Sequence, residues 1–195
     1  MAAFLKGLTL LAQDKLDPAA AAFRDAMRVS ADFSPAMVYL GAYYAAGGKD
    51  KEAAAVWRTA LIREGDVAAL HGLLADALLR QGRADLAVDD LDAARARWPA
   101  NQGLKRRFVM AALLAGRQRE GLEVLDAAIA ERTDDEPALA LALFMLYQAF
   151  DTGEPIESAN QDRERMLRLA ERYRETGGPS LALVDTWLAA AARQK

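Results

Sequence analysis

The sequence predicts an all-α protein, folded as a right-handed α-α superhelix of stacked helical hairpins. A spacing of about 34 residues recurs in phase at glycine, alanine and bulky apolar positions, and a fixed period of this length is typical of solenoids. Alanine also supplies much of the 53% hydrophobic content, which favours closely packed helices over a sheet. The positions that keep the spacing are Gly48, Gly82 and Gly116; Ala26, Ala60, Ala94 and Ala128; Phe23, Trp57, Leu91 and Leu125; Ala19, Ala53 and Ala87, followed by Gly121; and Gly7, followed by Gly41.

The period indicates one continuous array along the 195 residues. We expect eleven helices, arranged as five hairpins and one terminal helix. The predicted repeats cover residues about 1–33, 34–67, 68–101 and 102–135, followed by a degenerate fifth hairpin at 136–178 and a terminal helix at 180–193.

Turn signals place the helices of the first two repeats. Pro18 suits the first turn of a helix, where no backbone donor is needed. Gly48 follows a helical pattern and takes the left-handed conformation that ends a helix without steric cost, while Asp14 stands at the same position of the first repeat. The expected helices are Ala2–Gln13, Pro18–Ser30, Pro35–Ala46 and Lys51–Arg63.

The later elements follow the same signals until the period slips after Thr133. Ser158 and Gln161 have the spacing of a capping box, which predicts the start of a long helix that ends at about Thr176. The other expected helices are Ala68–Arg80, Ala84–Trp98, Gln102–Ala115, Gln118–Arg132, Pro137–Phe150 and Ser180–Arg193.

The repeating residues have a packing role. Small residues on both helices of a hairpin allow the two axes to approach closely, and the large series at Phe23, Trp57, Leu91 and Leu125 fills the space between hairpins. Pro99 follows the expected end of a helix in the third repeat.

These features resemble the tetratricopeptide repeat, a helix-turn-helix unit of about 34 residues with small residues on both helices. The resemblance covers Met1 to about Thr133. His71 and Lys105 stand where that family usually has tryptophan, and the closing proline is present once. The chaperone-tail-binding members use a Lys and Asn clamp, which is missing here because the corresponding positions are Phe4, Leu8 and Ala42.

Composition excludes several classes of partner. The formal net charge is −3, so neither nucleic acid nor an anionic membrane surface is an expected partner. No apolar run approaches the length of a membrane span, so membrane insertion is not expected. The chain has no cysteine, which is compatible with both cytoplasm and periplasm. Because Lys6 interrupts the apolar segment Met1–Ala12, we interpret this segment as a helix of the first repeat and not as a signal peptide.

The sequence offers little catalytic chemistry. The single histidine, His71, is expected to be a packed or half-exposed structural residue, and one histidine without cysteine argues against a zinc site. The acidic groups Asp89-Asp90-Leu91-Asp92 and Asp134-Asp135-Glu136 are expected on a solvated helix face and at a helix start, respectively. We therefore predict no enzyme, no catalytic residue, no cofactor and no metal ion.

The resemblance implies a concave groove lined by the first helix of each hairpin. Basic residues at 105–107 stand at the start of such a helix and favour either a solvated charged surface or a patch for an acidic peptide. Aromatic, Met and Arg side chains are enriched in binding hot spots. The candidate groove residues are Val38, Tyr39, Ala42, Asp76, Arg80, Arg106, Arg107, Met110, Phe144 and Tyr147.

Two functions follow from this pattern. The first is a protein–protein interaction scaffold that binds a partner protein or peptide in the groove. The alternative is an accessory segment of a larger multidomain protein, packed against a neighbouring enzymatic or sensor domain. Apolar residues at Leu5, Leu8 and Trp187 indicate that the terminal helices are interfaces, with a second copy of the chain or with another domain.

Overall fold

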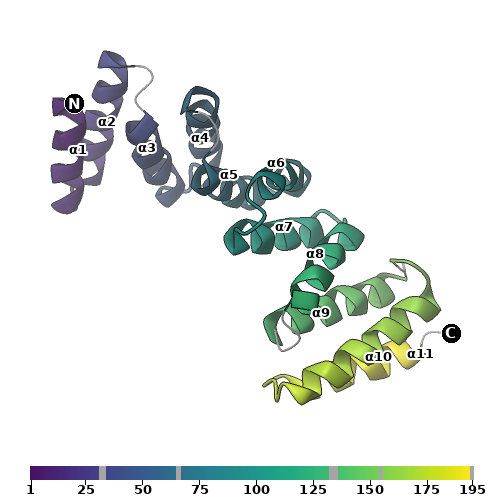
Figure 1. Cartoon of the computed structure of the whole chain (residues 1–195). Helices are drawn as coiled ribbons and strands as arrows, with labels where there is room; N and C mark the ends of the chain where they lie inside the picture. The colour runs from purple at the N-terminus through teal and green to yellow at the C-terminus, as the bar shows by residue number, and fades with distance from the viewer. Residues whose placement is uncertain (31–33, 65–66, 132–135, 154–155, 194–195) are drawn as a thin grey trace. The chain divides into compact units, whose positions relative to one another are not determined.

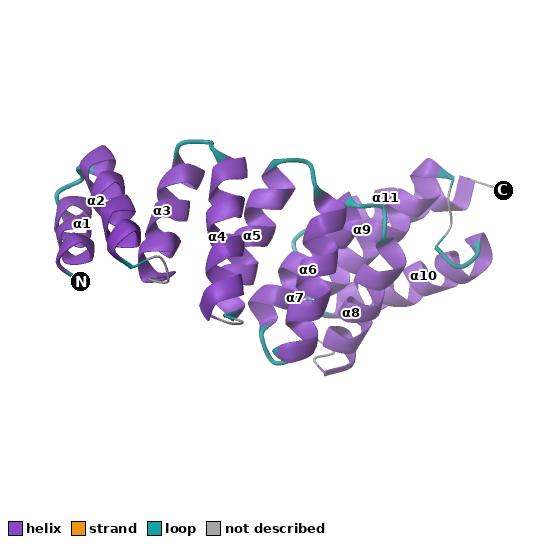
Figure 2. Ribbon diagram, turned by 90° about the horizontal axis from the view of Figure 1, so that it is seen from above, coloured by secondary structure: helices purple, strands orange, loops and turns teal. Residues whose placement is uncertain are grey.

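The computed structural model describes residues 1–30, 34–64, 67–131, 136–153 and 156–193, and these residues form eleven helices with no strand among them (Figure 1). Hairpin partners such as α1 (Ala2–Ala12) and α2 (Leu16–Val29) lie side by side (Figure 2). In chain order the helices are α1 (Ala2–Ala12), α2 (Leu16–Val29), α3 (Ser34–Ala46), α4 (Asp50–Glu64), α5 (Ala68–Arg80), α6 (Ala84–Arg97), α7 (Gln102–Leu114), α8 (Gln118–Glu131), α9 (Glu136–Thr152), α10 (Ala159–Glu175) and α11 (Leu181–Arg193).

The all-α prediction is confirmed, and the helix ends differ from the expected ones by two residues at most. The largest differences are at α2, which begins at Leu16 ahead of Pro18, and at α9, which continues past Phe150 to Thr152. Pro18 is tolerated at the third position of α2 because the first turn of a helix has no partner for its N–H groups.

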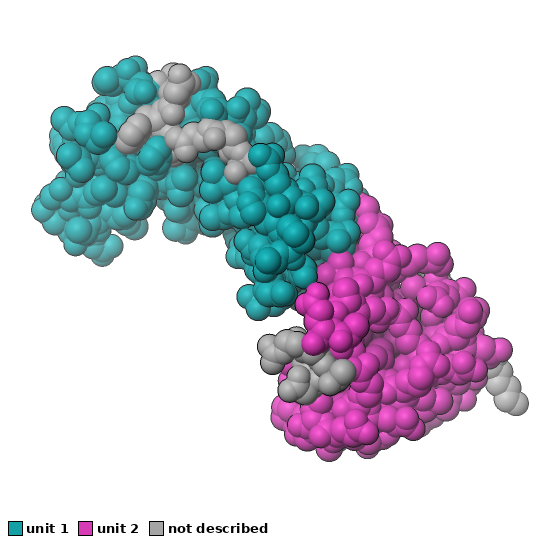
Figure 3. Space-filling model, viewed as in Figure 1, with its two compact units in different colours: residues 1–111 teal, residues 112–195 magenta. Residues whose placement is uncertain are grey.

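The chain forms two compact units, residues 1–111 and 112–195, and the boundary falls inside α7 (Figure 3). Helices α1 to α6 belong to the first unit, and α8 to α11 belong to the second. The single continuous array that the sequence predicts stays a prediction.

Turn residues at one register share one backbone conformation. Gly48, Gly82 and Gly116 have φ angles of 69°, 71° and 71°. Asp14 adopts the same left-handed region with a φ of 58°, although it carries a side chain. The helix ends that the glycine spacing predicts are therefore present. The turn at Asp14 has the same left-handed backbone, although glycine adopts this conformation at lower cost.

Glycine and aromatic residues fit together inside the first two hairpins. A Cβ atom added to Gly7 would lie 2.5 Å from the Phe23 ring, and one added to Gly41 would overlap the Trp57 indole. The Trp57 Nε1–H also donates to the carbonyl of Val38 at 3.2 Å. The predicted burial of the large series is confirmed, since Phe23, Trp57, Leu91 and Leu125 are at most 6% exposed.

The repeat register continues through α9, the first helix of the fifth hairpin. Buried residues of α9 at 138, 142, 143, 145 and 146 stand one full repeat after those of α7 at 104, 108, 109, 111 and 112. The slip that the sequence predicts after Thr133 therefore does not affect the register of α9. The slip comes after α9, because this helix is longer than α7 and is followed by a longer turn.

The second helix of the fifth hairpin keeps the buried pattern with a shift of seven residues. Met166 follows Leu125, and Ala170 follows Ile129, by one repeat and seven further positions. The same shift places Asp162 at the position of Gly121. Asp162 is only 1% exposed, so a buried carboxylate replaces the small residue of the regular repeats.

Candidate binding surface

Four of the predicted groove residues gather on one face of the first unit, between α5 and α7. Together with two further residues they line an open hollow of about 340 Å³, which we call the α5–α7 hollow. Its lining residues are Asp76, Leu79, Gly103, Arg106, Arg107 and Met110.

An ion pair ties the two helices together in this hollow. Arg107 donates from Nε and Nη2 to the two carboxylate oxygens of Asp76, at 2.9 and 3.1 Å. The bonds to Asp76 raise the pKa of the Arg107 guanidinium above its ordinary value. Such a bidentate pair fixes the plane of the guanidinium as well as its position. Both side chains are still 33–40% exposed, so the pair lies on the surface and not in the core.

Glycines leave space beside Arg107. A Cβ atom on Gly72 would lie 3.4 Å from its guanidinium carbon, and one on Gly103 would lie 3.5 Å from Nη1. A second hollow of about 340 Å³ is also lined by Arg107. Its other lining residues are Ala68, Ala69, Gly72, Leu73, Asn101 and Leu104.

Arg106 and Met110 are exposed residues of the α5–α7 hollow. Met110 is 44% exposed, and Arg106 is exposed one helical turn before it. Among the described residues, no carboxylate forms an ion pair with Arg106. The hollow therefore combines an available cation with a flexible apolar side chain.

The other predicted groove residues of the first unit do not line the α5–α7 hollow. Arg80 Nε donates to the Asp50 carboxylate at 2.7 Å. Tyr39 stacks on Phe23 with ring centroids 5.3 Å apart. Val38 is half-buried and Ala42 is exposed, and neither lines the α5–α7 hollow.

Phe144 and Tyr147 lie in the second unit, where α11 covers part of their surface. The Trp187 ring stacks on Tyr147 with centroids 5.6 Å apart and an interplanar angle of 18°, and it packs tilted against Phe144 at 5.7 Å. Arg174 pairs with Asp185 at 2.5 Å and so ties α10 to α11. The apolar groups expected at this end of the chain are thus partly covered by the chain itself.

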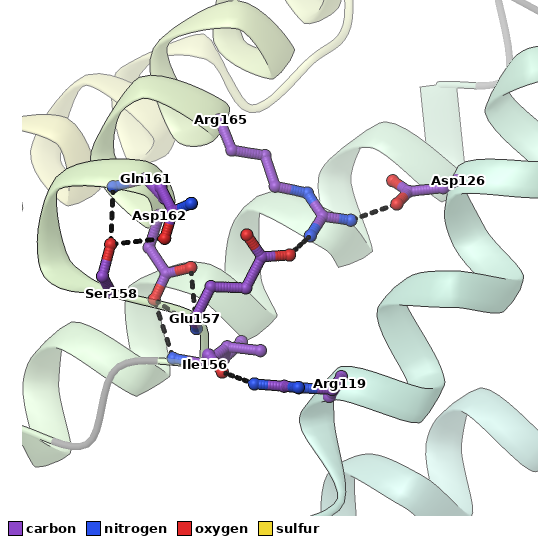
Figure 4. A network of polar contacts seen from close by, with 8 residues as sticks. All are labelled: Arg119, Asp126, Ile156, Glu157, Ser158, Gln161, Asp162 and Arg165. Carbon is purple, nitrogen blue, oxygen red and sulfur yellow. Dashed lines mark hydrogen bonds and ion pairs between the residues drawn. The ribbon is translucent and has the colours of Figure 1, made fainter.

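A larger hollow of about 510 Å³ lies in the second unit, between α8 and α10. Its charged lining is balanced, with three carboxylates and three guanidiniums, and Arg165 already bridges Asp126 and Glu157 (Figure 4). This balance gives no preference for an anionic or a cationic ligand. The lining residues are Asp126, Glu157, Gln161, Glu164, Arg165, Arg168, Leu169 and Arg172.

The same network has a structural role at the start of α10. The buried Asp162 carboxylate accepts from the backbone N–H groups of Ile156 at 2.7 Å and Glu157 at 3.3 Å. Ser158 Oγ accepts from the N–H of Gln161, as the capping-box spacing predicts, and Arg119 donates to the carbonyl of Ile156 (Figure 4). These bonds hold the long turn before α10 against α8.

His71, which the sequence predicts to be packed or half-exposed, is buried, and its Nδ1 lies 2.9 Å from Asp90 Oδ2. Asp90 therefore faces α5, and the expectation of a fully solvated acidic face is wrong for this residue. Glu136 opens α9 as expected, while Asp134 and Asp135 lie outside the described residues. Within the described ranges, no cluster of three or more His, Asp or Glu side chains is arranged to hold a metal ion.

None of the helices in the described ranges combines the length and apolar character needed to cross a membrane.

Solved structures resemble the chain, although no family model and no curated protein matches it. YrrB, a tetratricopeptide repeat protein described as having an unusual peptide-binding site, matches 94% of this chain and 90% of its own, at 18% identity and a TM-score of 0.73. MamA matches with 94% and 96% coverage, 18% identity and a TM-score of 0.68. PilF from Pseudomonas aeruginosa matches with 98% and 86% coverage, 16% identity and a TM-score of 0.61.

These likenesses define the class of the protein as an all-α solenoid. More specifically, the chain has the tetratricopeptide-repeat type of helical repeat fold, which confirms the resemblance seen in the sequence.

Proposed function

We propose that the chain is a non-catalytic scaffold that binds a partner protein or peptide through the α5–α7 hollow. The observation that carries this proposal is the grouping of Arg106, Met110 and the Arg107–Asp76 pair around one open hollow of about 340 Å³. Arginine is enriched in binding hot spots, and methionine adapts to varied apolar partners. The peptide-binding site described for YrrB supports the proposal by analogy of fold alone.

A pair of matched variants tests the proposal. R106E/M110E reverses the charge and removes the apolar group on α7, without touching the buried residues. R58E/I62E makes the same change on α4, where Arg58 and Ile62 are also exposed and also four residues apart. Affinity capture from the native organism should lose its partner with the first variant and retain it with the second. Circular dichroism should show that both variants stay folded.

If R106E/M110E captures every partner that the unchanged chain captures, binding takes place elsewhere and the proposal is wrong. Loss of the partner with both variants equally would point to a general effect of added negative charge, which would also contradict a role of this hollow.

Exposed apolar side chains on the terminal helices support the alternative, an accessory segment or self-associating chain. Leu5 and Leu11 on α1 are 54% and 36% exposed, and Leu183 on α11 is 47% exposed. Light scattering over a concentration series, with L5E/L11E as the comparison, tests self-association through α1. A longer open reading frame encoding an adjacent domain would favour the accessory role.

A further inference from the structure

The first helices of the hairpins in the first unit share one face of the repeat. Arg107 stands two repeats after Tyr39, and Gly72 stands two repeats after Phe4. The Phe4 and Tyr39 rings lie 5.9 Å apart, so these positions bring α1 against α3. A Cβ atom on Gly72 would lie 3.4 Å from the Arg107 guanidinium, so the same positions bring α5 against α7. We call the surface that carries these equivalent positions the first-helix face.

At α1 and α3 the first-helix face is apolar. Leu5 is 54% exposed, and Tyr39, one repeat after it, is 38% exposed. Ala42 is exposed one helical turn after Tyr39. Because Tyr39 stacks on Phe23 with ring centroids 5.3 Å apart, its ring is held in place before any ligand binds. We call Leu5, Tyr39 and Ala42 the α1–α3 apolar set.

At α5 and α7 the first-helix face carries three arginines, two of which have carboxylate partners within the chain. Arg80 pairs with Asp50 at 2.7 Å, and Arg107 pairs with Asp76 at 2.9 Å. Among the described residues, no carboxylate forms an ion pair with Arg106, which is exposed on the rim of the α5–α7 hollow. A ligand on this part of the face is therefore expected to supply one carboxylate and not an acidic cluster.

The apolar set and Arg106 belong to different repeats. A compact ligand can contact one of them, whereas a ligand that contacts both must extend over α3, α5 and α7. Leu79 and Met110 line the hollow beside Arg106, so apolar side chains also continue along the face on α5 and α7. The face therefore differs in chemistry between its two ends, with apolar groups alone at α1 and α3 and an available cation at α7.

We propose that the first-helix face binds an extended segment of a partner protein, which packs apolar side chains on the α1–α3 apolar set and places one carboxylate against Arg106. This inference rests on the proposed function and adds the chemical class of the ligand. Because apolar surface and charge lie at opposite ends of the face, they also fix the direction in which the segment lies.

A library of random dodecapeptides displayed on phage is the probe, and the full chain is the immobilised target. Twelve extended residues reach about 40 Å, which is more than the width of three packed helices about 10 Å apart. Parallel selections use the R106E and A42E chains. R58E and A55E are the matched controls, since Arg58 and Ala55 are exposed on α4, outside the first-helix face.

Selection on the unchanged chain should enrich peptides that carry apolar residues and one Asp or Glu, always on the same side of the apolar residues. R106E should exchange the acidic preference for Lys or Arg and keep the apolar preference, because the ligand then meets a carboxylate. A42E should add a basic preference at the apolar end and keep the acidic preference at the other. R58E and A55E should change neither preference.

Fluorescence anisotropy on the most enriched peptide gives the size of the charge effect. Replacing its acidic residue by alanine should weaken binding to the unchanged chain by about tenfold, as expected for loss of a close charge pair. The same replacement should strengthen binding to the R106E chain, because it removes a like charge.

A new basic preference is a gain of selectivity and cannot arise from unfolding, so the two separate shifts support the inference. An acidic preference that R106E leaves unchanged, an apolar preference that A42E leaves unchanged, or no enriched peptide overturns it. Self-association that A42E abolishes in light scattering would place a second copy on the apolar set and would also overturn it. If partner capture still depends on Arg106 and Met110 in these cases, the proposed function stands and only the ligand class is wrong. If capture is also independent of them, both proposals fail.

Discussion

The first two hairpins and the fifth hairpin fill the same two positions in opposite ways. In the first two, a glycine on one helix accepts an aromatic ring from the next, as Gly7 and Gly41 do for Phe23 and Trp57. In the fifth, the glycine position is Leu143 and the aromatic position is Met166, and neither is exposed. The combined size of the two residues is kept while their individual sizes change, which is how a close-packed repeat tolerates sequence variation.

A second difference between these hairpins concerns the polar groups at the start of the second helix. The start of α4 follows a glycine turn at Gly48, whereas at the start of α10 a buried carboxylate, that of Asp162, binds the backbone of the preceding turn. The comparison teaches that both kinds of hairpin are packed by apolar side chains, and that the irregular one adds a buried, hydrogen-bonded carboxylate.

The largest effect is expected for W57A. Removing a fully buried indole should lower the free energy of unfolding by about 3–5 kcal/mol, because a cavity remains beside Gly41. Chemical denaturation measures the change. I62A on the same helix is the control and should cost less than about 0.5 kcal/mol, since Ile62 is 79% exposed. A cost of W57A below about 1 kcal/mol would contradict the role of apolar volume in the regular hairpins.

The second-largest effect is expected when the buried Asp162 carboxylate is removed. D162A should cost about 2–3 kcal/mol, because the N–H groups of Ile156 and Glu157 lose a charged acceptor. D151A, an exposed aspartate at the end of α9, should be nearly neutral in the same denaturation experiment. Equal stability of the two variants would show that the long turn before α10 does not need its carboxylate.

The third prediction tests the compensation of sizes directly. G41A should cost about 1–3 kcal/mol, because the new methyl group overlaps the Trp57 indole. The third hairpin has Ala75 and Leu91 at these positions, so G41A should cost much less in a W57L background. A double-mutant cycle should give a coupling of about 1 kcal/mol or more. Additive costs would mean that the two positions are independent.

The smallest effect is a gain. D14G should stabilise the chain by about 0.5 kcal/mol, because glycine adopts the left-handed conformation of this turn without a side-chain penalty. D25G, placed inside α2, should cost about 1 kcal/mol instead. If D14G and D25G shift the thermal midpoint in the same direction, the effect of D14G does not come from the left-handed conformation of the turn, and the prediction is wrong.

Most of the fold could be predicted from the sequence, because the repeat spacing reports local packing. Trp57 and Gly82 are examples. In a folded repeat the position of Trp57 is buried, and the position of Gly82 ends a helix. The fifth hairpin could not be predicted as well. Its extra seven residues move Asp162 out of phase, and an aspartate in a polar stretch gives no sign of burial.

The candidate surface could be predicted only in part. Asp76, Arg106, Arg107 and Met110 lie together because they share one face of consecutive first helices, and the resemblance implied this face. Residue spacing could also have indicated the pair of Arg107 with Asp76. The contact of α11 with Phe144 and Tyr147 had no such signal, because a terminal helix follows no repeat.

The close fit of Gly41 against Trp57 also restricts the order in which this hairpin can change over generations. A methyl group gained first would meet the indole, whereas an indole replaced first by a smaller side chain leaves room for the methyl group to follow. A hairpin with glycine and tryptophan can therefore reach the alanine and leucine of the third hairpin by replacing the tryptophan first and the glycine second. Relatives that have exchanged one residue of the pair should more often retain the glycine beside a smaller partner than combine an alanine with a tryptophan.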